Sequence, residues 1–198
     1  MGVCQSKEVR SQMLVNKKIE KQLAKDQEEG ATVIKLLLLG AGECGKSTVL
    51  KQMQIIHSNG FSEEEIQEKK QIVYANATTA MGALLKALET LEIPFDEPER
   101  EVDAKVVHRI LESGDETSPF SDELFNSLKQ LWIDNGIKTA YERRNEFQLH
   151  DGTKHFLDSL ERIHQPAYRP TTQDILYTRV ATSGIVETHF TIKGLDFR

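Results

Sequence analysis

The sequence predicts an α/β fold in which an all-helical domain is inserted after the first helix of a phosphate-binding domain. Three observations lead to this prediction. An apolar segment, Val33 to Leu39, is followed at once by a glycine-rich run that starts at Gly40. Helical periodicity without a convincing strand then extends from Ser62 to about Pro170. An alternating segment, Ile185 to Ile192, predicts a strand that returns the chain to the α/β domain, and a hairpin turn is predicted after it at Lys193-Gly194.

The composition is that of an ordinary acidic protein of one or two domains. The 198 residues include 25 Lys and Arg against 31 Asp and Glu, which gives a net charge of −6. A nucleic-acid surface needs a basic patch, so this balance does not favour a nucleic-acid partner. The two cysteines, Cys4 and Cys44, lack disulfide or metal-ligand spacing, which fits a reducing, intracellular setting. No apolar run approaches the ~20 residues of a membrane span, so we expect neither a transmembrane helix nor a cleavable signal peptide.

The first residues carry a lipidation signal. Met1-Gly2-Val3-Cys4-Gln5-Ser6 matches the M-G-x-x-x-[ST] pattern for myristoylation of Gly2, and Cys4 beside it is placed for palmitoylation. A single myristoyl chain binds a bilayer only marginally, so stable anchoring needs a second signal. We therefore expect attachment to a membrane through Gly2 and Cys4.

The segment from Ser6 to Glu29 predicts one exposed helix that ends near Gly30. It is charged, lacks proline, and places a few apolar residues close to one helical stripe. A lone helix with such a stripe gains little stability by itself, so a docking surface is expected along it. The stripe consists of Val9, Met13, Ile19 and Leu23.

The glycine-rich run has the complete G-x-x-x-x-G-K-[ST] pattern of a phosphate-binding loop. The segment before it predicts a strand buried on both faces, and the segment after it predicts a helix whose buried face carries Val49, Leu50, Met53 and Ile56. The glycines let backbone N–H groups converge on phosphate oxygens, and the helix N-terminus adds its dipole. The alternative, a glycine-rich turn without a ligand, does not explain this order of strand, loop and helix.

Two polar side chains of the loop have expected tasks. Lys46 would neutralise the terminal phosphates, and the Ser47 hydroxyl would ligate Mg²⁺. The loop residues that we expect to bind the nucleotide are Gly40, Glu43, Cys44, Gly45, Lys46, Ser47 and Thr48.

Residues 61–177 are predicted to form the separate helical domain. Ser62 and Glu65 form a capping box, and apolar residues then keep a helical spacing until Pro94. The histidines and aromatic residues of this segment fit core or surface positions better than ligand positions. Shorter helices are predicted at Ala104 to Ser113, Asp122 to Asp134, Ile137 to Arg144 and Thr153 to His164.

The two segments that flank the helical domain resemble a known family. The runs G-A-G-E-x-G-K-S-T and T-R-V-x-T-x-G-I-V-E-T-H-F, separated by a helical insert of this size, are similar to those of the α subunits of heterotrimeric G proteins. The resemblance covers essentially the whole chain. It implies a lipidated helix at residues 1–30, an incomplete P-loop (Ras-like) GTPase domain at 31–60 and 178–198, and the helical insert at 61–177.

The resemblance also implies roles for individual residues. Arg179 would be the built-in arginine finger that stabilises charge on the transferred phosphate, and Glu43 would pair with it. Thr182 would join Ser47 on Mg²⁺. The other contacts with GTP or GDP would come from the cleft between the two domains, through Asp151, Leu176, Tyr177, Thr178, Arg179, Val180, Ala181 and Thr182.

A protein of this family is a GTPase switch at the cytoplasmic face of the plasma membrane. The resemblance implies three partners: a βγ dimer in the GDP state, a downstream effector in the GTP state, and a G-protein-coupled receptor. Two other functions stay open. A P-loop kinase with a helical lid would need further phosphate-binding arginines in the lid, and a truncated interaction module would occupy membrane or βγ without turnover.

The sequence departs from the family pattern in composition and in extent. Cys44 replaces a serine, Tyr177 an arginine, and Ala181 a basic residue. The family's D-x-G-G-Q, N-K-x-D and T-C-A-T segments would lie beyond Arg198, so we expect a fragment or an early-terminated product. Residues 1–198 alone are expected to bind GTP weakly at best and to show no turnover, whereas the helical insert is expected to fold.

Overall fold

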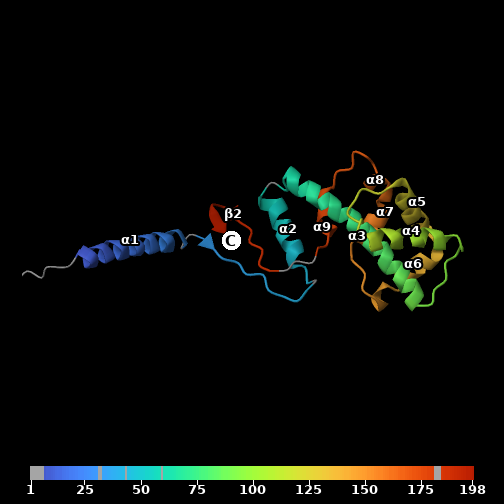
Figure 1. The fold of residues 1–198 in the computed structure, drawn as a ribbon, viewed down its shortest axis with the longest axis horizontal. Coiled ribbons are helices and arrows are strands. Elements are labelled where there is room, and N and C mark those ends of the chain that lie inside the picture. The colour runs from blue at the N-terminus through green and yellow to red at the C-terminus, as the bar shows by residue number, and fades with distance from the viewer. Residues whose placement is uncertain (1–6, 31–32, 43, 59, 181–183) are drawn as a thin grey trace, which may run out of the picture. The chain divides into compact units, whose positions relative to one another are not determined.

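The computed structural model describes residues 7–30, 33–42, 44–58, 60–180 and 184–198 (Figure 1). The chain divides into two compact units. One, called the sheet unit below, consists of Met1–Asn59 and Gly184–Arg198, and the other, called the helical unit, of Gly60–Ser183. The further assignment of the chain to a lipidated helix, a partial GTPase domain and an insert stays a prediction.

The sheet unit contains a small three-stranded sheet. Its strands lie in the order β1-β3-β2, with β1 parallel to β3 and β2 antiparallel to β3. Both residues of the β2–β3 turn, Lys193 and Gly194, have positive φ, as the tightest hairpin turns require, and the predicted hairpin is confirmed. The elements of this unit are α1 (Lys7–Gly30), β1 (Val33–Ile34), α2 (Lys46–His57), β2 (Phe190–Ile192) and β3 (Leu195–Phe197).

The strands are shorter and more exposed than predicted. β1 ends at Ile34, although the N–H of Leu36 still donates to the carbonyl of Arg198 at 2.9 Å. Leu37 is 80% exposed and Leu39 is 79% exposed. The prediction of a strand buried on both faces is wrong for this structure, because within the described part of the unit only β3 pairs with β1. In the same way, β2 begins at Phe190 and not at Ile185.

α2 packs against the sheet through a narrow contact. The ring of His57 lies 5.9 Å from the ring of Phe190, which in turn stacks on Phe197 at 5.3 Å. Val49 and Ile56 are exposed, and no residue of α2 is buried. The predicted buried face of α2 is therefore wrong, because the sheet beneath the helix is too small to cover it, and Leu50 and Met53 are only half-buried.

α1 is the predicted exposed helix and ends at Gly30 as expected. Met13, Ile19 and Leu23 of the predicted stripe are all more than half exposed. Among the helices of the described residues, none combines the length and the apolar character that crossing a bilayer requires.

The helical unit is built around one long helix, α3 (Glu63–Thr90). Its start is the predicted capping box: the Ser62 hydroxyl accepts from the N–H of Glu65 at 3.2 Å, and the Glu65 carboxylate accepts from the N–H of Ser62 at 2.8 Å. The helices that follow are α4 (Arg100–Ser113), α5 (Asp122–Ile133), α6 (Asn135–Glu142), α7 (Thr153–Asp158), α8 (Leu160–Ile163) and α9 (Thr172–Tyr177), with a 3-10 turn, η1, at Arg144–Glu146.

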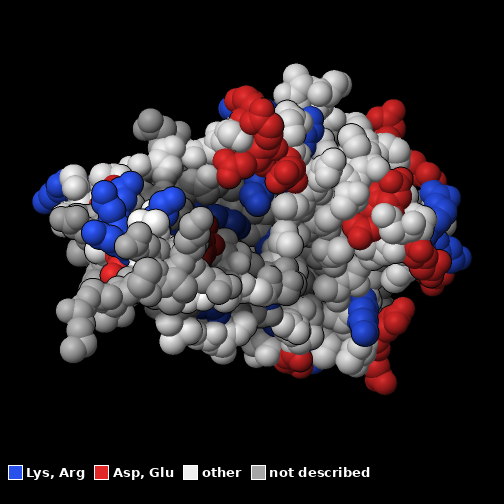
Figure 2. Space-filling view, turned by 60° about the vertical axis from the view of Figure 1, so that its left-hand side comes forward, with Lys and Arg blue, Asp and Glu red and all other residues white. Residues whose placement is uncertain are grey.

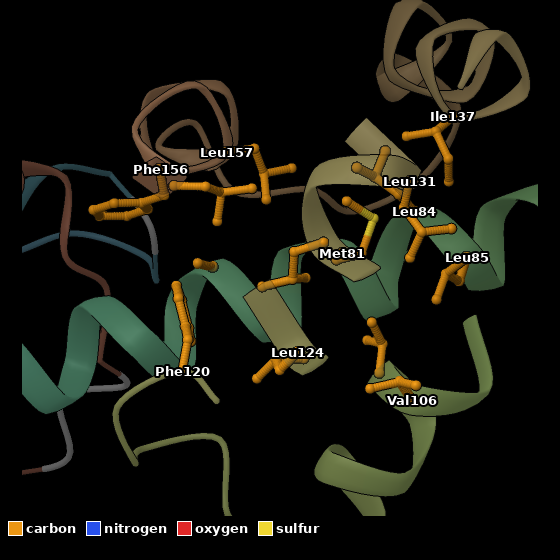
Figure 3. Close-up of a cluster of buried hydrophobic side chains, with 14 of the residues drawn as sticks. Met81, Leu84, Leu85, Val106, Phe120, Leu124, Leu131, Ile137, Phe156 and Leu157 are labelled. Atoms are coloured by element: carbon orange, nitrogen blue, oxygen red, sulfur yellow. The ribbon is translucent and has the colours of Figure 1, made fainter. Parts of the chain in front are cut away.

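The core of the helical unit lies along one face of α3. Figure 3 shows Met81, Leu84 and Leu85 of α3 surrounded by side chains from several other helices. All of these side chains are less than a tenth exposed. The surrounding residues include Val106 of α4, Leu124 and Leu131 of α5, Ile137 of α6, Phe156 and Leu157 of α7, and Phe120.

The surface of the helical unit carries many charges of both signs. Figure 2 shows groups of acidic side chains with basic ones between them on the face drawn there. Several of these charges pair across neighbouring elements: Arg109 with Glu123 at 2.6 Å, and Lys129 with Glu161 at 2.6 Å. Exposed pairs of this kind contribute little to stability, so the buried core carries the fold.

Candidate functional site

The phosphate-loop residues lie between β1 and α2 in the sheet unit. Gly40 has φ 156° and Gly45 has φ 88°, and both values favour glycine. A Cβ on Gly40 would come within 2.5 Å of the Cys44 Sγ, so a side chain there would collide with the loop itself. Gly45 is the N-cap of α2, and the first N–H groups of a helix lie outside its own hydrogen-bond ladder.

The side chain of Lys46 folds back over the loop. Its Nζ donates to the carbonyl of Gly40 at 2.8 Å and to the carbonyl of Ala41 at 2.7 Å, and it lies 3.6 Å from the Cys44 Sγ. The ammonium group therefore lies over the backbone of the loop, at the N-terminus of α2, which is the positive end of the helix dipole. The loop therefore combines a cation, a helix N-terminus and backbone N–H groups, and these three features together favour the binding of an anion.

A second group of predicted site residues lies at the end of α9 in the helical unit. This helix was not predicted, although Thr171 and Asp174 form a capping box at its start. The Thr171 hydroxyl accepts from the N–H of Asp174 at 3.1 Å, and the Asp174 carboxylate accepts from the N–H of Thr171 at 2.8 Å. At its other end, Thr178 closes the helix through its hydroxyl, which donates to the carbonyl of Ile175 at 2.7 Å.

Asp174 anchors this helix to α7 and α8. Arg162 donates to both carboxylate oxygens at 2.7 Å, and His155 Nε2 lies 2.7 Å from Oδ1. Burial opposes ionisation of this carboxyl group, but the hydrogen bonds from Arg162, the backbone of Thr171 and His155 outweigh it and hold the pKa of Asp174 well below its usual range. Asp174 is therefore an ionised anchor inside the unit.

Tyr177 lies against His155 of α7 and against the turn that precedes this helix. The Tyr177 ring lies 4.7 Å from the His155 ring, and a Cβ on Gly152 would lie only 3.1 Å from the carbonyl oxygen and Cβ of Tyr177. The turn that carries Asp151 thus packs directly on the end of α9. Leu176 is half-buried beside them, and Asp151 itself is exposed.

Arg179 follows directly after the end of α9. Its N–H donates to Oδ1 of Asn76 in α3 at 2.7 Å, and its carbonyl accepts from Nδ2 of the same side chain at 3.0 Å. Asn76 carries no signal in the sequence, because its partner lies 103 residues further along the chain.

The predicted site residues thus form two groups. Those of the phosphate loop belong to the sheet unit, and Asp151 with residues 176–180 belongs to the helical unit. Five predicted residues lie outside the described part of the chain, namely Gly2, Cys4, Glu43, Ala181 and Thr182. Among the described residues, no cluster of three or more His, Cys, Asp or Glu side chains is arranged to hold a metal ion.

The comparison with protein families decides what this loop and this helical unit belong to. The model of the G-protein alpha subunit family matches residues 14–198. The chain belongs to the G-protein alpha subunit family.

Several curated alpha subunits are similar to this chain over its whole length. The guanine nucleotide-binding protein alpha-17 subunit of Caenorhabditis elegans is 52% identical over 199 residues. The G(o) subunit alpha of Planorbella trivolvis is 49% identical over 198 residues, and that of Locusta migratoria is 48% identical over the same length. In each case the match covers 100% of this chain and 56% of the relative. The family resemblance drawn from the two motifs is confirmed.

Proposed function

We propose that this alpha subunit is the guanine-nucleotide switch of a heterotrimeric G protein, binding GDP and GTP and hydrolysing GTP. The observation that carries the proposal is the position of the Lys46 ammonium, within 2.8 Å of two loop carbonyls at the start of α2. The relatives are named guanine nucleotide-binding proteins, which supports GTP and GDP over other nucleotides as the ligand.

The loop is proposed to bind the phosphates mainly through its backbone. N–H groups at the start of α2 would donate to phosphate oxygens, and Lys46 would exchange its carbonyl partners for them. This mode tolerates a cysteine at position 44, because the backbone and not the side chain makes the contact. Gly40, Gly45 and Thr48 would line the same cradle.

Mg²⁺ fits the donor chemistry of the site. This ion is usually held by one or two protein oxygens together with substrate phosphates, so it requires no cluster of carboxylates. Ser47 at the start of α2 offers such an oxygen, and Thr182 is proposed as the second. Bound there, Mg²⁺ would neutralise charge on the phosphates.

Arg179 is the proposed catalytic arginine, with Glu43 as its proposed partner in the loop. A guanidinium beside the transferred phosphate stabilises the charge that develops in the transition state. Around it, Leu176, Tyr177, Thr178 and Val180, together with Ala181, would contact the nucleotide, and Asp151 would approach it from the turn before α7.

The proposed setting is the cytoplasmic face of the plasma membrane. Myristate on Gly2 and palmitate on Cys4 would together supply the two anchors that stable attachment needs. The exposed stripe of α1, including Met13, Ile19 and Leu23, is the proposed contact with the βγ dimer. A receptor and an effector complete the proposed set of partners.

The loop proposal is tested by nucleotide binding in a protein of full family length. We define the full-length chimera as residues 1–198 of this chain joined to the remaining C-terminal segment of the C. elegans alpha-17 subunit. Lys46→Met in this chimera should raise the Kd for a fluorescent GDP analogue by roughly 100-fold, about the effect of losing one desolvated charge-assisted contact. Lys51→Met, on the same helix, is the matched control and should change the Kd less than about threefold. Equal Kd values for the two variants would contradict the proposal.

A further inference from the structure

We propose that Asn76 is a positioning residue for Arg179: its side-chain amide fixes the backbone from which the arginine side chain extends. The inference rests on the catalytic role proposed above for Arg179. It adds to that role a residue of α3 that is not itself among the proposed nucleotide or metal contacts.

Asn76 meets Arg179 through both ends of its amide. Oδ1 accepts from the Arg179 N–H at 2.7 Å, and Nδ2 donates to the Arg179 carbonyl at 3.0 Å. The two hydrogen bonds engage both the N–H and the carbonyl of one residue, as the backbone of a neighbouring strand would. They therefore restrict both backbone torsions of Arg179, and with them the direction in which its Cβ points.

The amide is itself held firmly. Asn76 sits mid-way along α3 and is only 9% exposed, and its neighbour Ala77 is fully buried in the core. α9 lies beside α3 at this point (Figure 1). A side chain that projects from the central helix of the unit has little freedom to move, so it transmits the rigidity of that helix to Arg179.

The chain is buried against the helical unit at Thr178 and becomes exposed directly after Arg179. Thr178 is 5% exposed, and its N–H donates to the carbonyl of Asp174 at 3.0 Å. Val180, on the other side, is exposed. Arg179 thus stands at the boundary between an anchored helix end and the chain that continues from it, and the Asn76 amide is what holds its backbone there.

Only asparagine supplies what this position needs. The side chain must be short, and it must offer one acceptor and one donor in a plane. Aspartate keeps an acceptor for the N–H but presents its second oxygen to the Arg179 carbonyl, where no donor remains. Alanine loses both hydrogen bonds.

A shift of the Arg179 backbone would also move its guanidinium, and catalysis by this group depends on its position relative to the transferred phosphate. A displacement of about 1 Å at a reacting group can cost on the order of 100-fold in rate, without a matching loss of binding. A purely structural role for Asn76, that of satisfying two backbone groups, would lower stability but would not single out the hydrolysis step.

The test is single-turnover GTP hydrolysis by the full-length chimera, with GDP affinity measured in parallel. Asn76→Ala and Asn76→Asp should each slow hydrolysis by about 10- to 100-fold while the Kd for GDP changes less than about threefold. The matched control is Thr79→Ala. Thr79 is half-buried on the same helix, and its hydroxyl donates within that helix, to the carbonyl of Ala75 at 2.7 Å among others. This control should hydrolyse GTP at the rate of the unmodified chimera.

A double variant separates the positioning role from other effects. If Asn76 acts through Arg179, then Asn76→Ala should cause no further slowing in an Arg179→Ala background. Additive slowing, or hydrolysis by both Asn76 variants within twofold of the unmodified chimera, would overturn the inference.

The single variants separate this inference from the proposed role of Arg179. If Arg179→Ala alone hydrolyses GTP within a fewfold of the unmodified chimera, the catalytic role of Arg179 fails, and the inference fails with it. If only Arg179→Ala is slow, the inference fails alone. Should Asn76→Ala not fold, Asn76→Asp, which retains one of the two hydrogen bonds, decides the matter.

Discussion

Arg162 donates one hydrogen bond to each carboxylate oxygen of Asp174, both at 2.7 Å. Asp174 is fully buried, and it also receives the N–H of Thr171 at 2.8 Å and the Tyr168 hydroxyl at 3.1 Å. Burial and the neighbouring carboxylate in turn raise the pKa of Tyr168, so this hydroxyl stays a donor. One carboxylate thus joins α7, α8 and the start of α9, the helix that ends at Tyr177, two residues before Arg179.

The Asp174 network makes the stability of the helical unit depend on acid pH. The folded pKa of Asp174 lies below its unfolded value of about 3.9, so its contribution is present above that pH and is lost as pH falls further. Asp174→Asn should lower the free energy of unfolding at pH 7 by about 3 kcal/mol, and the loss should shrink as the pH is lowered below about 4. Urea unfolding at pH 7 and at pH 3 measures both.

Asp122→Asn is the matched control for that experiment. Its carboxylate also faces a histidine, with His164 Nε2 at 3.1 Å, but its side chain is 93% exposed. Exposed pairs contribute about 0–1 kcal/mol, so this variant should unfold almost as the unmodified protein does. Equal losses for the two aspartate variants would show that burial of Asp174 does not govern its contribution.

The helical unit should fold without the sheet unit. All buried hydrophobic residues of the described chain, from Ile66 to Ile175, lie within it, and no residue of α2 is buried. A polypeptide of residues 60–183 should therefore unfold in one cooperative thermal transition, followed by far-UV circular dichroism. A gradual, non-cooperative loss of signal would mean that the core needs contacts from outside this unit.

Bound nucleotide should protect Cys44 from alkylation. Cys44 is exposed, and its Sγ lies 3.6 Å from the ammonium of Lys46, inside the proposed phosphate cradle. In the full-length chimera, saturating GDP with Mg²⁺ should slow its reaction with iodoacetamide about tenfold or more, because only the ligand-free fraction reacts. In protein prepared without palmitate, so that the Cys4 thiol is free, peptide mapping by mass spectrometry gives Cys4 as an internal control, whose rate should not change. Equal rates at Cys44 with and without GDP would contradict phosphate binding by this loop.

The lipid anchors should decide where the protein is found in cells. Gly2→Ala should move the protein from the membrane fraction to the cytosol, because it removes the myristate on which stable attachment depends. Val3→Ala leaves the motif intact and should stay with the membrane. Fractionation in which both variants distribute alike would remove Gly2 from this role.

Local signals predicted the parts of the fold that depend on near neighbours. The Ser62–Glu65 capping box, the turn at Lys193 and Gly194, and the phosphate-loop motif each specify their own geometry within a few residues, and the structure has the first two as predicted. The strand after residue 33 was predicted too long and too buried, because burial of a strand depends on partners that its own sequence does not identify.

The candidate site shows the same limit more sharply. The short helix α9 was missed, although its capping box at Thr171 and Asp174 is visible as a T-x-x-D pattern. Asn76 was missed because nothing around it distinguishes it from any other polar residue of a long helix. Its proposed role depends on a contact with a residue 103 positions further along the chain, and only the folded structure shows that the two meet.

The distance along the chain between Asn76 and Arg179 also sets an order of events during synthesis. The asparagine leaves the ribosome 103 residues before its partner, so its amide has no Arg179 to bind until α4 to α9 are made. The hydrogen bonds to Arg179 then form only after those helices have assembled correctly between the two. A newly made chain would therefore hold Arg179 in place only once the helices between the two residues have been made.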